Sequence, residues 1–428
     1  MELVITESNP KIGVVGLSHL GLVTSLSFAA KKIRVTGFDL SPLVVAEFNS
    51  GSFTVEEPGL HEVLYEFREY IDFSSDLESL NECDLIYIAK DIPTDDQGFS
   101  NLKPIHELIE VASKYFSKDS IIIILCQVAP GFTRELSKEL EQSLYYQVET
   151  LIFGDAINRA LRPERYIVGK VDNLHELSPT YLRVLETFGC PIIQTTFESA
   201  ELAKLAINLY LASSITTTNS LAEICESIGA DWNQIVPALR LDERIGSKSY
   251  VQPGLGISGG NIERDIASII NLGLHYKTDV GIFQSFIHNS NHRKNWPVKK
   301  IDEIETDGIK LHKIAIWGFA YKKDTHSIKN SPAIKIIHDL KDKYEIVATD
   351  PIAELPQNLS VSVKFETEPL EAVSGADCLL ILTDWSIYSK IDLDELFDKI
   401  GKKIIIDPYG VLNDKAQKMS LRYFRLGY

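Results

Sequence analysis

The sequence is poor in positive charge and in cysteine, and it contains no long hydrophobic run. Its 43 basic residues stand against 60 acidic ones, a net charge of −17. This balance argues against nonspecific binding to nucleic acid or to an anionic membrane, because both reward clustered Lys and Arg. No apolar stretch approaches the roughly 20 residues that a spanning helix needs. The N-terminal MELVITESNP lacks the basic flank and apolar centre of a secretory signal.

The five cysteines are scattered along the chain and form no C-x-x-C pair. Most of them stand in or beside apolar segments, as reduced thiols do in the cytosol. We therefore predict a cytoplasmic protein with no metal site, no nucleic-acid partner and no membrane partner.

The whole chain has enough residues for two or three domains. In its first part, short apolar runs alternate with helical patterns. This is the rhythm of a doubly wound parallel sheet. We expect a helix at 22–30 and strands at 11–16, 33–39, 84–89 and 120–128. The rhythm returns after residue 311, with a helix at 331–340 and strands at 313–320, 345–351, 377–385 and 403–410.

Residues 198–229 contain no proline and no internal glycine, which predicts one long helix that ends at Gly229. Further helices are expected to about residue 290, and NHRKNWPVKK at 291–300 reads as a polar joint. The flanking parts echo each other, since IGVVGL matches IAIWGF and IRVTGFD matches YEIVATD. The predicted fold class is α/β, with two Rossmann-like doubly wound parallel sheets flanking a central all-helical domain.

A degenerate dinucleotide-binding fingerprint follows the first expected strand. In GLSHLG, Gly16 and Gly21 take the first and third glycine positions of G-x-G-x-x-G, and Ser18 takes the second. Gly16 would make the tight turn, Gly21 would let helix and strand pack closely, and the helix N-terminus would offer N–H groups to a pyrophosphate. Ser18 is small, and its hydroxyl could bind a phosphate oxygen.

Asp39 ends the second strand, where an acid can bind the ribose hydroxyl, and no Arg follows it directly, so NAD is favoured over NADP. A purely structural strand–turn–helix is the alternative. The predicted cofactor residues here are Gly16, Ser18, His19, Leu20, Gly21 and Asp39.

Seven further segments, in order, make the chain resemble the UDP-glucose/GDP-mannose dehydrogenase family over nearly its whole length. They are EEPGL (56–60), VAPGFT (128–133), RPERYIVG (162–169), AELAKLAINLYLA (200–212), RIG (244–246), PGLGISGGNIERD (253–265) and GFAYKKDTHSIKNSPA (318–333). The resemblance implies an NAD-binding domain at 1–195, a helical dimerisation and active-site domain at 196–300, and a nucleotide-sugar (UDP) domain at 301–428.

Such enzymes oxidise C6 of a nucleotide sugar twice, from alcohol through aldehyde to carboxylate. Lys204 and Asn208 match the family's active-site Lys and Asn, and their spacing puts them on one helical face. Asp265 matches an acid that relays protons or holds water, and Glu149 matches a water-activating glutamate. The alternatives are a snorkelling surface lysine, a helix-start acid and a plain surface glutamate.

The second oxidation ordinarily uses a cysteine thiolate that forms a thioester. When Pro253 to Asp265 is aligned without gaps, that cysteine position holds Asn261, whose amide nitrogen is not nucleophilic. Two predicted cofactor-binding positions also differ from the family, because Gln127 replaces a water-holding Thr and Arg264 replaces a Lys. Either the aldehyde reacts as its hydrate, with water held by Gln127 and Glu149, or the reaction stops at an aldehyde or ketone.

The resemblance also implies a substrate site. Tyr321 and Lys322 would meet the base and the sugar nucleotide, and Arg244 would reach a diphosphate from the neighbouring subunit, since its planar donor fork suits phosphate. The substrate loop would comprise Tyr250, Gly254 and Gly256; ordinary surface or core roles are the alternative for each.

We predict an NAD-dependent homodimer that acts on a UDP-hexose, or a GDP-hexose, in polysaccharide or nucleotide-sugar biosynthesis. Two other classes remain open. One is a redox-neutral epimerase that keeps its NAD, and the other is a non-catalytic nucleotide-sugar-binding protein.

Overall fold

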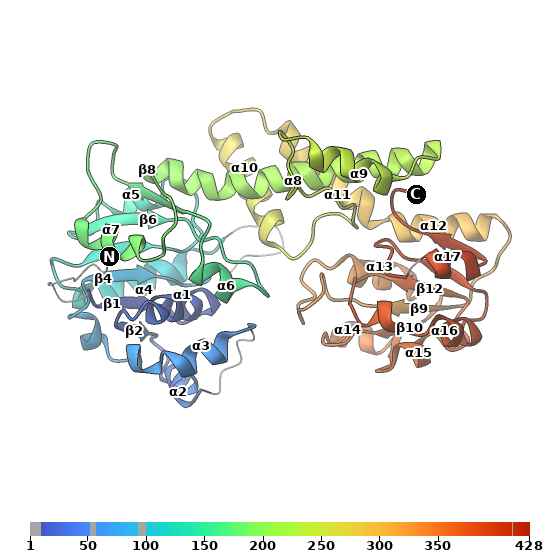
Figure 1. Cartoon of the computed structure of the whole chain (residues 1–428), viewed down its shortest axis with the longest axis horizontal. Helices are drawn as coiled ribbons and strands as arrows, with labels where there is room; N and C mark the ends of the chain where they lie inside the picture. Colours follow the sequence, from blue (N-terminus) through green and yellow to red (C-terminus); the bar gives the residue numbers. More distant parts are fainter. Residues whose placement is uncertain (1–9, 52–56, 93–99, 413) are drawn as a thin grey trace. The chain divides into compact units, whose positions relative to one another are not determined.

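The computed structural model describes residues 10–51, 57–92, 100–412 and 414–428. MELVITESN at the N-terminus and Glu56 of the EEPGL segment lie outside these ranges. The chain forms two compact units, Met1–Ile207 and Asn208–Tyr428. Helix α8 (Phe197–Ile228) contributes residues to both (Figure 1). Among the described helices, none is both long and apolar enough to cross a bilayer.

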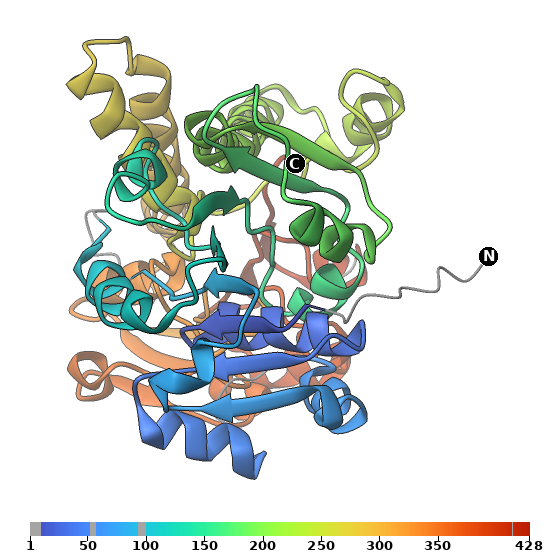
Figure 2. The same cartoon turned by 90° about the vertical axis from the view of Figure 1, so that its left-hand side faces the viewer.

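An eight-stranded sheet organises the first unit, with strand order β3-β2-β1-β4-β5-β6-β7-β8. Figure 2 views this unit, with its first strands in blue. The first six positions of this order are those of a dinucleotide-binding sheet. Neighbouring strands are parallel except β6 and β7, which are antiparallel, a feature that the sequence reading did not include. The strands are β1 (Ile12–Val15), β2 (Val35–Phe38), β3 (Ile71–Ser74), β4 (Leu85–Ile88), β5 (Ile121–Ile124), β6 (Ser143–Gln147), β7 (Tyr166–Lys170) and β8 (Ile192–Thr196).

Helices cover both faces of this sheet, which is why its central strands are continuous apolar runs. One face packs against α1 (His19–Ala30), α3 (Leu60–Glu66) and α7 (Pro179–Glu186). The other packs against α4 (Lys103–Ala112), α5 (Phe132–Leu136) and the start of α8. All residues of β1, β4 and β5 are buried, so both sheet faces lie in the core.

The second unit combines helices with a six-stranded sheet. Helix α8 ends at Ile228, and Gly229 follows with a φ of +74°, so the predicted long helix and its glycine stop are confirmed. The other helices of the region are α9 (Trp232–Leu241), α10 (Asn261–His275), α11 (Gly281–Lys294) and α12 (Trp296–Thr306).

The polar joint expected at 291–300 is wrong, because α11 and α12 occupy this segment almost continuously. Arg293 is fully buried, and its guanidinium lies 3.3 Å from Glu223 and 3.2 Å from Glu226 of α8. The indole of Trp296 donates to Glu226 at 2.7 Å. The partners of Arg293, one of the charges that suggested a solvated joint, lie on a helix some 70 residues away, where a local sequence pattern does not reveal them.

The second sheet is parallel throughout, with order β11-β10-β9-β12-β13-β14. It repeats the first sheet's opening turn: Gly318 has a φ of +84°, and Asp350 accepts from the backbone N–H of Phe319 at 2.8 Å. Trp385 also donates to Asp350, at 3.1 Å. The strands are β9 (Lys313–Trp317), β10 (Glu345–Thr349), β11 (Val363–Phe365), β12 (Cys378–Ile381), β13 (Ile404–Ile406) and β14 (Arg422–Phe424), and α13 (Pro332–Leu340) follows β9. The two doubly wound sheets with helices between them in sequence confirm the predicted fold class.

Candidate active site

The turn after β1 requires glycine at two positions. Gly16 has a φ of +101°, which a residue with a side chain rarely adopts. A Cβ at Gly21 would lie 1.8 Å from the carbonyl oxygen of Gly16, so α1 can sit this close to the strand only without a side chain there. Asp39, nearly buried at the end of β2, accepts from the N–H groups of Leu17 at 3.0 Å and Ser41 at 2.9 Å. The acid therefore helps to fix the turn beside which it lies.

Ser18 precedes α1 and is bonded to the end of β4. Its hydroxyl donates to the carbonyl of Ala89 at 3.1 Å and accepts from the N–H of Asp91 at 3.2 Å. Burial raises the pKa of the Asp91 carboxyl. The single hydroxyl proton of Ser18 is donated to the carbonyl of Ala89. In this arrangement the hydroxyl has no second proton to donate to a phosphate oxygen.

The geometry nevertheless fits a dinucleotide. The Ser18 side chain makes no cap hydrogen bond to α1. The first-turn N–H groups of a helix have no acceptor within the helix, and they favour an anion such as a pyrophosphate. The missing Cβ at Gly21 and the left-handed backbone at Gly16 provide the close backbone approach that this ligand needs.

His19 and Leu20 begin α1. His19 places Nε2 3.0 Å from a carboxylate oxygen of Glu57, and its ring centroid lies 4.4 Å from that of Phe153. Leu20 is buried and lines a pocket beside the turn. The sequence alone predicts no role for Glu57, and the only signal for it is its place in the EEPGL segment.

Lys204 and Glu149 are brought together. The ammonium of Lys204 donates to the backbone carbonyl of Glu149 at 2.8 Å and to its carboxylate at 3.1 Å. The Lys204 side chain is 12% exposed and that of Glu149 17%. The other carboxylate oxygen of Glu149 accepts from the N–H of Leu151. Neither residue is a solvated surface charge.

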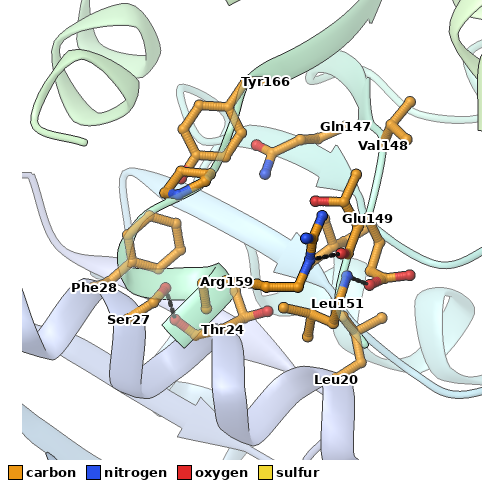
Figure 3. A pocket seen from close by; sticks show the side chains of 14 residues that line it. Leu20, Thr24, Ser27, Phe28, Gln147, Val148, Glu149, Leu151, Arg159 and Tyr166 are labelled. Atoms are coloured by element: carbon orange, nitrogen blue, oxygen red, sulfur yellow. Dashed lines mark hydrogen bonds between the residues drawn. The ribbon is translucent and has the colours of Figure 1, made fainter. Parts of the chain in front are cut away.

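Glu149 also lines the pocket shown in Figure 3, which has about 430 Å³ of empty space, part of it open to solvent. Its walls come from α1, β6, α6 (Ala156–Leu161) and the loop between β6 and α6. Arg159 of α6 donates from Nε to the carbonyl of Thr150 at 2.8 Å, which ties this loop to the helix that follows it. Gln127 is half-buried three residues beyond the end of β5, where Leu125 lines the same pocket.

Asn208 and Asp265 form a second pair. The Asn208 amide donates to one carboxylate oxygen of Asp265, and Arg264 approaches the other at 3.2 Å. Asp265 is fully buried in the first turns of α10. A buried carboxylate needs such partners, because an unpaired charge there would be costly. Asp265 is therefore not the solvated helix-start acid that was its alternative reading.

Asn261 is the first residue of α10 and is exposed. Cys225 and Cys378, the cysteines of the same unit, are both buried in the hydrophobic core. In the first unit, burial raises the pKa of Cys83 to about 11 and that of Cys126 to about 12. These two thiols are protonated near neutral pH and are therefore poor nucleophiles.

The loop before α10 packs on residues of its own unit. A Cβ at Gly256, where φ is +79°, would lie 2.6 Å from the carbonyl oxygen of Ser290. A Cβ at Gly259 would lie 2.4 Å from the ring of Tyr321, so this ring presses directly on the loop backbone. Burial raises the pKa of the Tyr321 phenol. Lys322 holds its ammonium 5.7 Å from the centre of the same ring.

The remaining predicted substrate residues lie at and before this loop. Gly254 donates its N–H to the side chain of Asn219 at 2.8 Å, and Tyr250 is 44% exposed. Arg244 follows α9 with its side chain 89% exposed, and its guanidinium contacts Asp242. The structure thus gathers Tyr321, Lys322 and the glycine loop, while Arg244 points to solvent.

A glycine turn with an acid at the end of the next strand, on the first of two doubly wound sheets, is the geometry of a dinucleotide-binding protein. The chain belongs to the UDP-glucose/GDP-mannose dehydrogenase family. Residues 10–185 match the family's NAD binding domain, 198–292 its central domain and 315–414 its UDP binding domain. It is therefore an NAD-dependent oxidoreductase that acts on a nucleotide sugar.

Individual relatives agree with this assignment. The chain is 29% identical to UDP-glucose 6-dehydrogenase of Rickettsia typhi, covering 97% of this chain and 99% of the relative. It is 27% identical to UDP-glucose 6-dehydrogenase YwqF of Bacillus subtilis, covering 97% of each. A UDP-glucose dehydrogenase structure from Pyrobaculum islandicum has the same fold, with a TM-score of 0.84 at 22% identity over 97% of each chain.

Proposed function

We propose that this protein oxidises a carbinol of a UDP-hexose by hydride transfer to NAD, and that it releases the product before the acid stage. Lys204 carries the first part of the proposal, because it is a largely buried lysine held against Glu149 rather than exposed to solvent. Bound NAD supplies the hydride acceptor. UDP is the proposed nucleotide because the C-terminal sheet matches the family's UDP binding domain.

Lys204 and Asn208 stand one turn apart on α8, so their side chains leave the same helical face. In the proposed reaction the Lys204 ammonium stabilises the sugar oxygen as negative charge develops on it. Asp265, hydrogen-bonded to Asn208, accepts or relays the hydroxyl proton. Both carboxylates, Glu149 and Asp265, already have donors, so their orientation is set before a substrate arrives.

Asn261 supports the second part of the proposal. It stands where the family resemblance places the nucleophilic cysteine, and an amide cannot form the thioester that leads to the acid. The experiment is to incubate protein, NAD and UDP-glucose and to count NADH per sugar, with the product identified by mass spectrometry. One NADH per sugar with an aldehyde or ketone product is the expected result.

Every other outcome of this experiment has a definite meaning. Two NADH per sugar and a uronic acid would refute incomplete oxidation and support the hydrate route. An isomerised sugar with no net NADH would identify the redox-neutral epimerase. Binding of both molecules with no chemistry would leave a nucleotide-sugar-binding protein.

We also propose a homodimer in which α8 packs on a second copy. Large apolar side chains of α8 are exposed, with Tyr210 81%, Ile224 52% and Ile228 71% exposed. Arg244 would then be free to reach the diphosphate site of the partner, as the family resemblance implies. Sedimentation equilibrium should give twice the chain mass, and a monomer at micromolar concentration would disprove this part.

The product would enter polysaccharide or nucleotide-sugar biosynthesis.

A further inference from the structure

Glu57 is a fully buried carboxylate that joins two segments of the first unit. Its side chain has no exposed surface. One oxygen accepts from the N–H of Ala156 at 2.7 Å. The other accepts from the N–H of Gly154 at 3.2 Å and lies 3.0 Å from Nε2 of His19. The carboxylate therefore binds the start of α6 and the first residue of α1 together.

The segment that Glu57 holds is the continuation of the one that carries Glu149. Residues 149–155 run from the end of β6 to α6. At the first end, Lys204 binds both the carbonyl and the carboxylate of Glu149. At the far end, Glu57 binds Gly154 and Ala156. Next to Glu149, Arg159 holds the carbonyl of Thr150.

The other side of the contact is the dinucleotide turn. His19 is the first residue of α1 and directly follows Ser18, so it stands at the turn where we expect the cofactor to bind. Its ring lies against Phe153, which belongs to the same 149–155 segment. Nε2 must carry a proton in order to donate to the Glu57 carboxylate. The His19 ring is therefore held by Glu57 at its edge and by Phe153 at its face. Displacement of Glu57 would release both the turn and the segment.

We propose that Glu57 is a positioning residue for the reaction: its carboxylate fixes the 149–155 segment, and with it Glu149 and Lys204, relative to the dinucleotide turn. This inference rests on the proposed function, because it assigns the reaction to that site. The carboxylate form is required, since the N–H groups of Gly154 and Ala156 need one oxygen each. A glutamine would offer only one oxygen and would turn an NH₂ group toward the other N–H.

The test is Glu57→Gln, with Asp377→Asn as the matched control. Asp377 also accepts from two backbone N–H groups, of His312 at 2.7 Å and Lys313 at 3.2 Å, and from one side chain, that of Lys402. It stands just before β12, at the opposite end of that strand from the turn loops of the second sheet. Both variants lose a carboxylate with similar bonding, so an effect on stability alone would be common to them.

We expect Glu57→Gln to lower kcat by about 10- to 100-fold, the usual effect of misplacing a reacting group by about an ångström. NAD affinity should also weaken, because one amide oxygen cannot replace both carboxylate oxygens and the link between His19 and the segment is lost on one side. Asp377→Asn should lower the melting temperature and leave kcat and NAD affinity unchanged. A folded Glu57→Gln protein with kcat within twofold of wild type would overturn the proposal.

Two further measurements keep the proposal testable. If Glu57→Gln does not fold, Glu57→Asp retains the charge but is one methylene too short to hold both segments, and an unchanged kcat in that variant would also overturn it. Hydrogen exchange at Gly154 and Ala156 reports the contact without any turnover. If wild type oxidises no nucleotide sugar, the proposed function fails, whereas unchanged exchange at these two amides in Glu57→Gln means that Glu57 does not hold the segment.

Discussion

Asn261→Cys places a thiol where the family resemblance expects one, and it should convert a single oxidation into a double one. Asn261 is the first residue of α10, follows Gly260 with its φ of +96°, and is exposed. Asn261 is exposed and is not itself the capping residue, which is Gly260, so its substitution should change stability by about 0.5 kcal/mol or less. The variant should therefore fold like wild type, so that a change in stoichiometry reports chemistry.

The expected reactivity follows from the position of the new thiol. A helix N-terminus stabilises a negative charge by about 0.3–1 kcal/mol, which lowers a thiol pKa by about 0.2–0.7 units. From an ordinary value near 8.5, the thiolate fraction at pH 8 would rise from about one quarter to between about one third and three fifths. Glu263, in the same turn, adds little opposing charge because Lys294 lies 2.9 Å from it.

Two assays on the same preparation follow this change. Titration with a chromogenic disulfide should show one fast thiol more than the wild-type protein does. NADH formed per UDP-glucose should rise from one to two, and the product should change to the acid. Asn261→Ser, which has a hydroxyl in place of the thiol, is the control and should remain at one NADH per sugar.

Two results would refute this prediction. Two NADH per sugar from wild type would show that the acid forms without a thiol at position 261. A reactive thiol in Asn261→Cys, with still one NADH per sugar, would show that this side chain does not reach the oxidised carbon.

Three further variants test the fold and the site. Gly21→Ala should abolish NAD binding, measured by calorimetry, because its Cβ would lie 1.8 Å from the carbonyl oxygen of Gly16; binding at wild-type affinity would contradict the turn geometry. Lys204→Ala should lower kcat by about 100- to 1,000-fold in steady-state assays, as loss of an oxyanion-stabilising donor does, and a decrease below tenfold would argue against its role. Glu226→Gln should lower the free energy of unfolding, measured in urea, by about 3 kcal/mol. This is the lower end for a broken buried ion pair, because a second glutamate remains beside Arg293. An unchanged urea midpoint would show that the pair contributes no stability.

Much of the fold could be predicted because it depends on local patterns. The central strands are buried on both faces, so they are short continuous apolar runs, and the long helix has no residue that breaks it before Gly229. Strands β3, β6 to β8, β11 and β14 were missed. They are short, and those at 143–147 and 192–196 mix polar with apolar residues, so they lack a distinctive period.

The sequence by itself determined the two doubly wound sheets, the long helix and the glycine turn, since spacing and residue type alone specify these features. Only the tertiary structure decided which charges have partners. It paired Lys204 with Glu149, Asn208 with Asp265 and Arg293 with α8, and it showed that Glu57 holds the start of α1 and of α6. These contacts join residues 38 to 99 positions apart. Glu57 makes both the shortest, to His19, and the longest, to Ala156. Partners so distant in the chain are chosen by the packing of whole elements, and no local pattern records that choice.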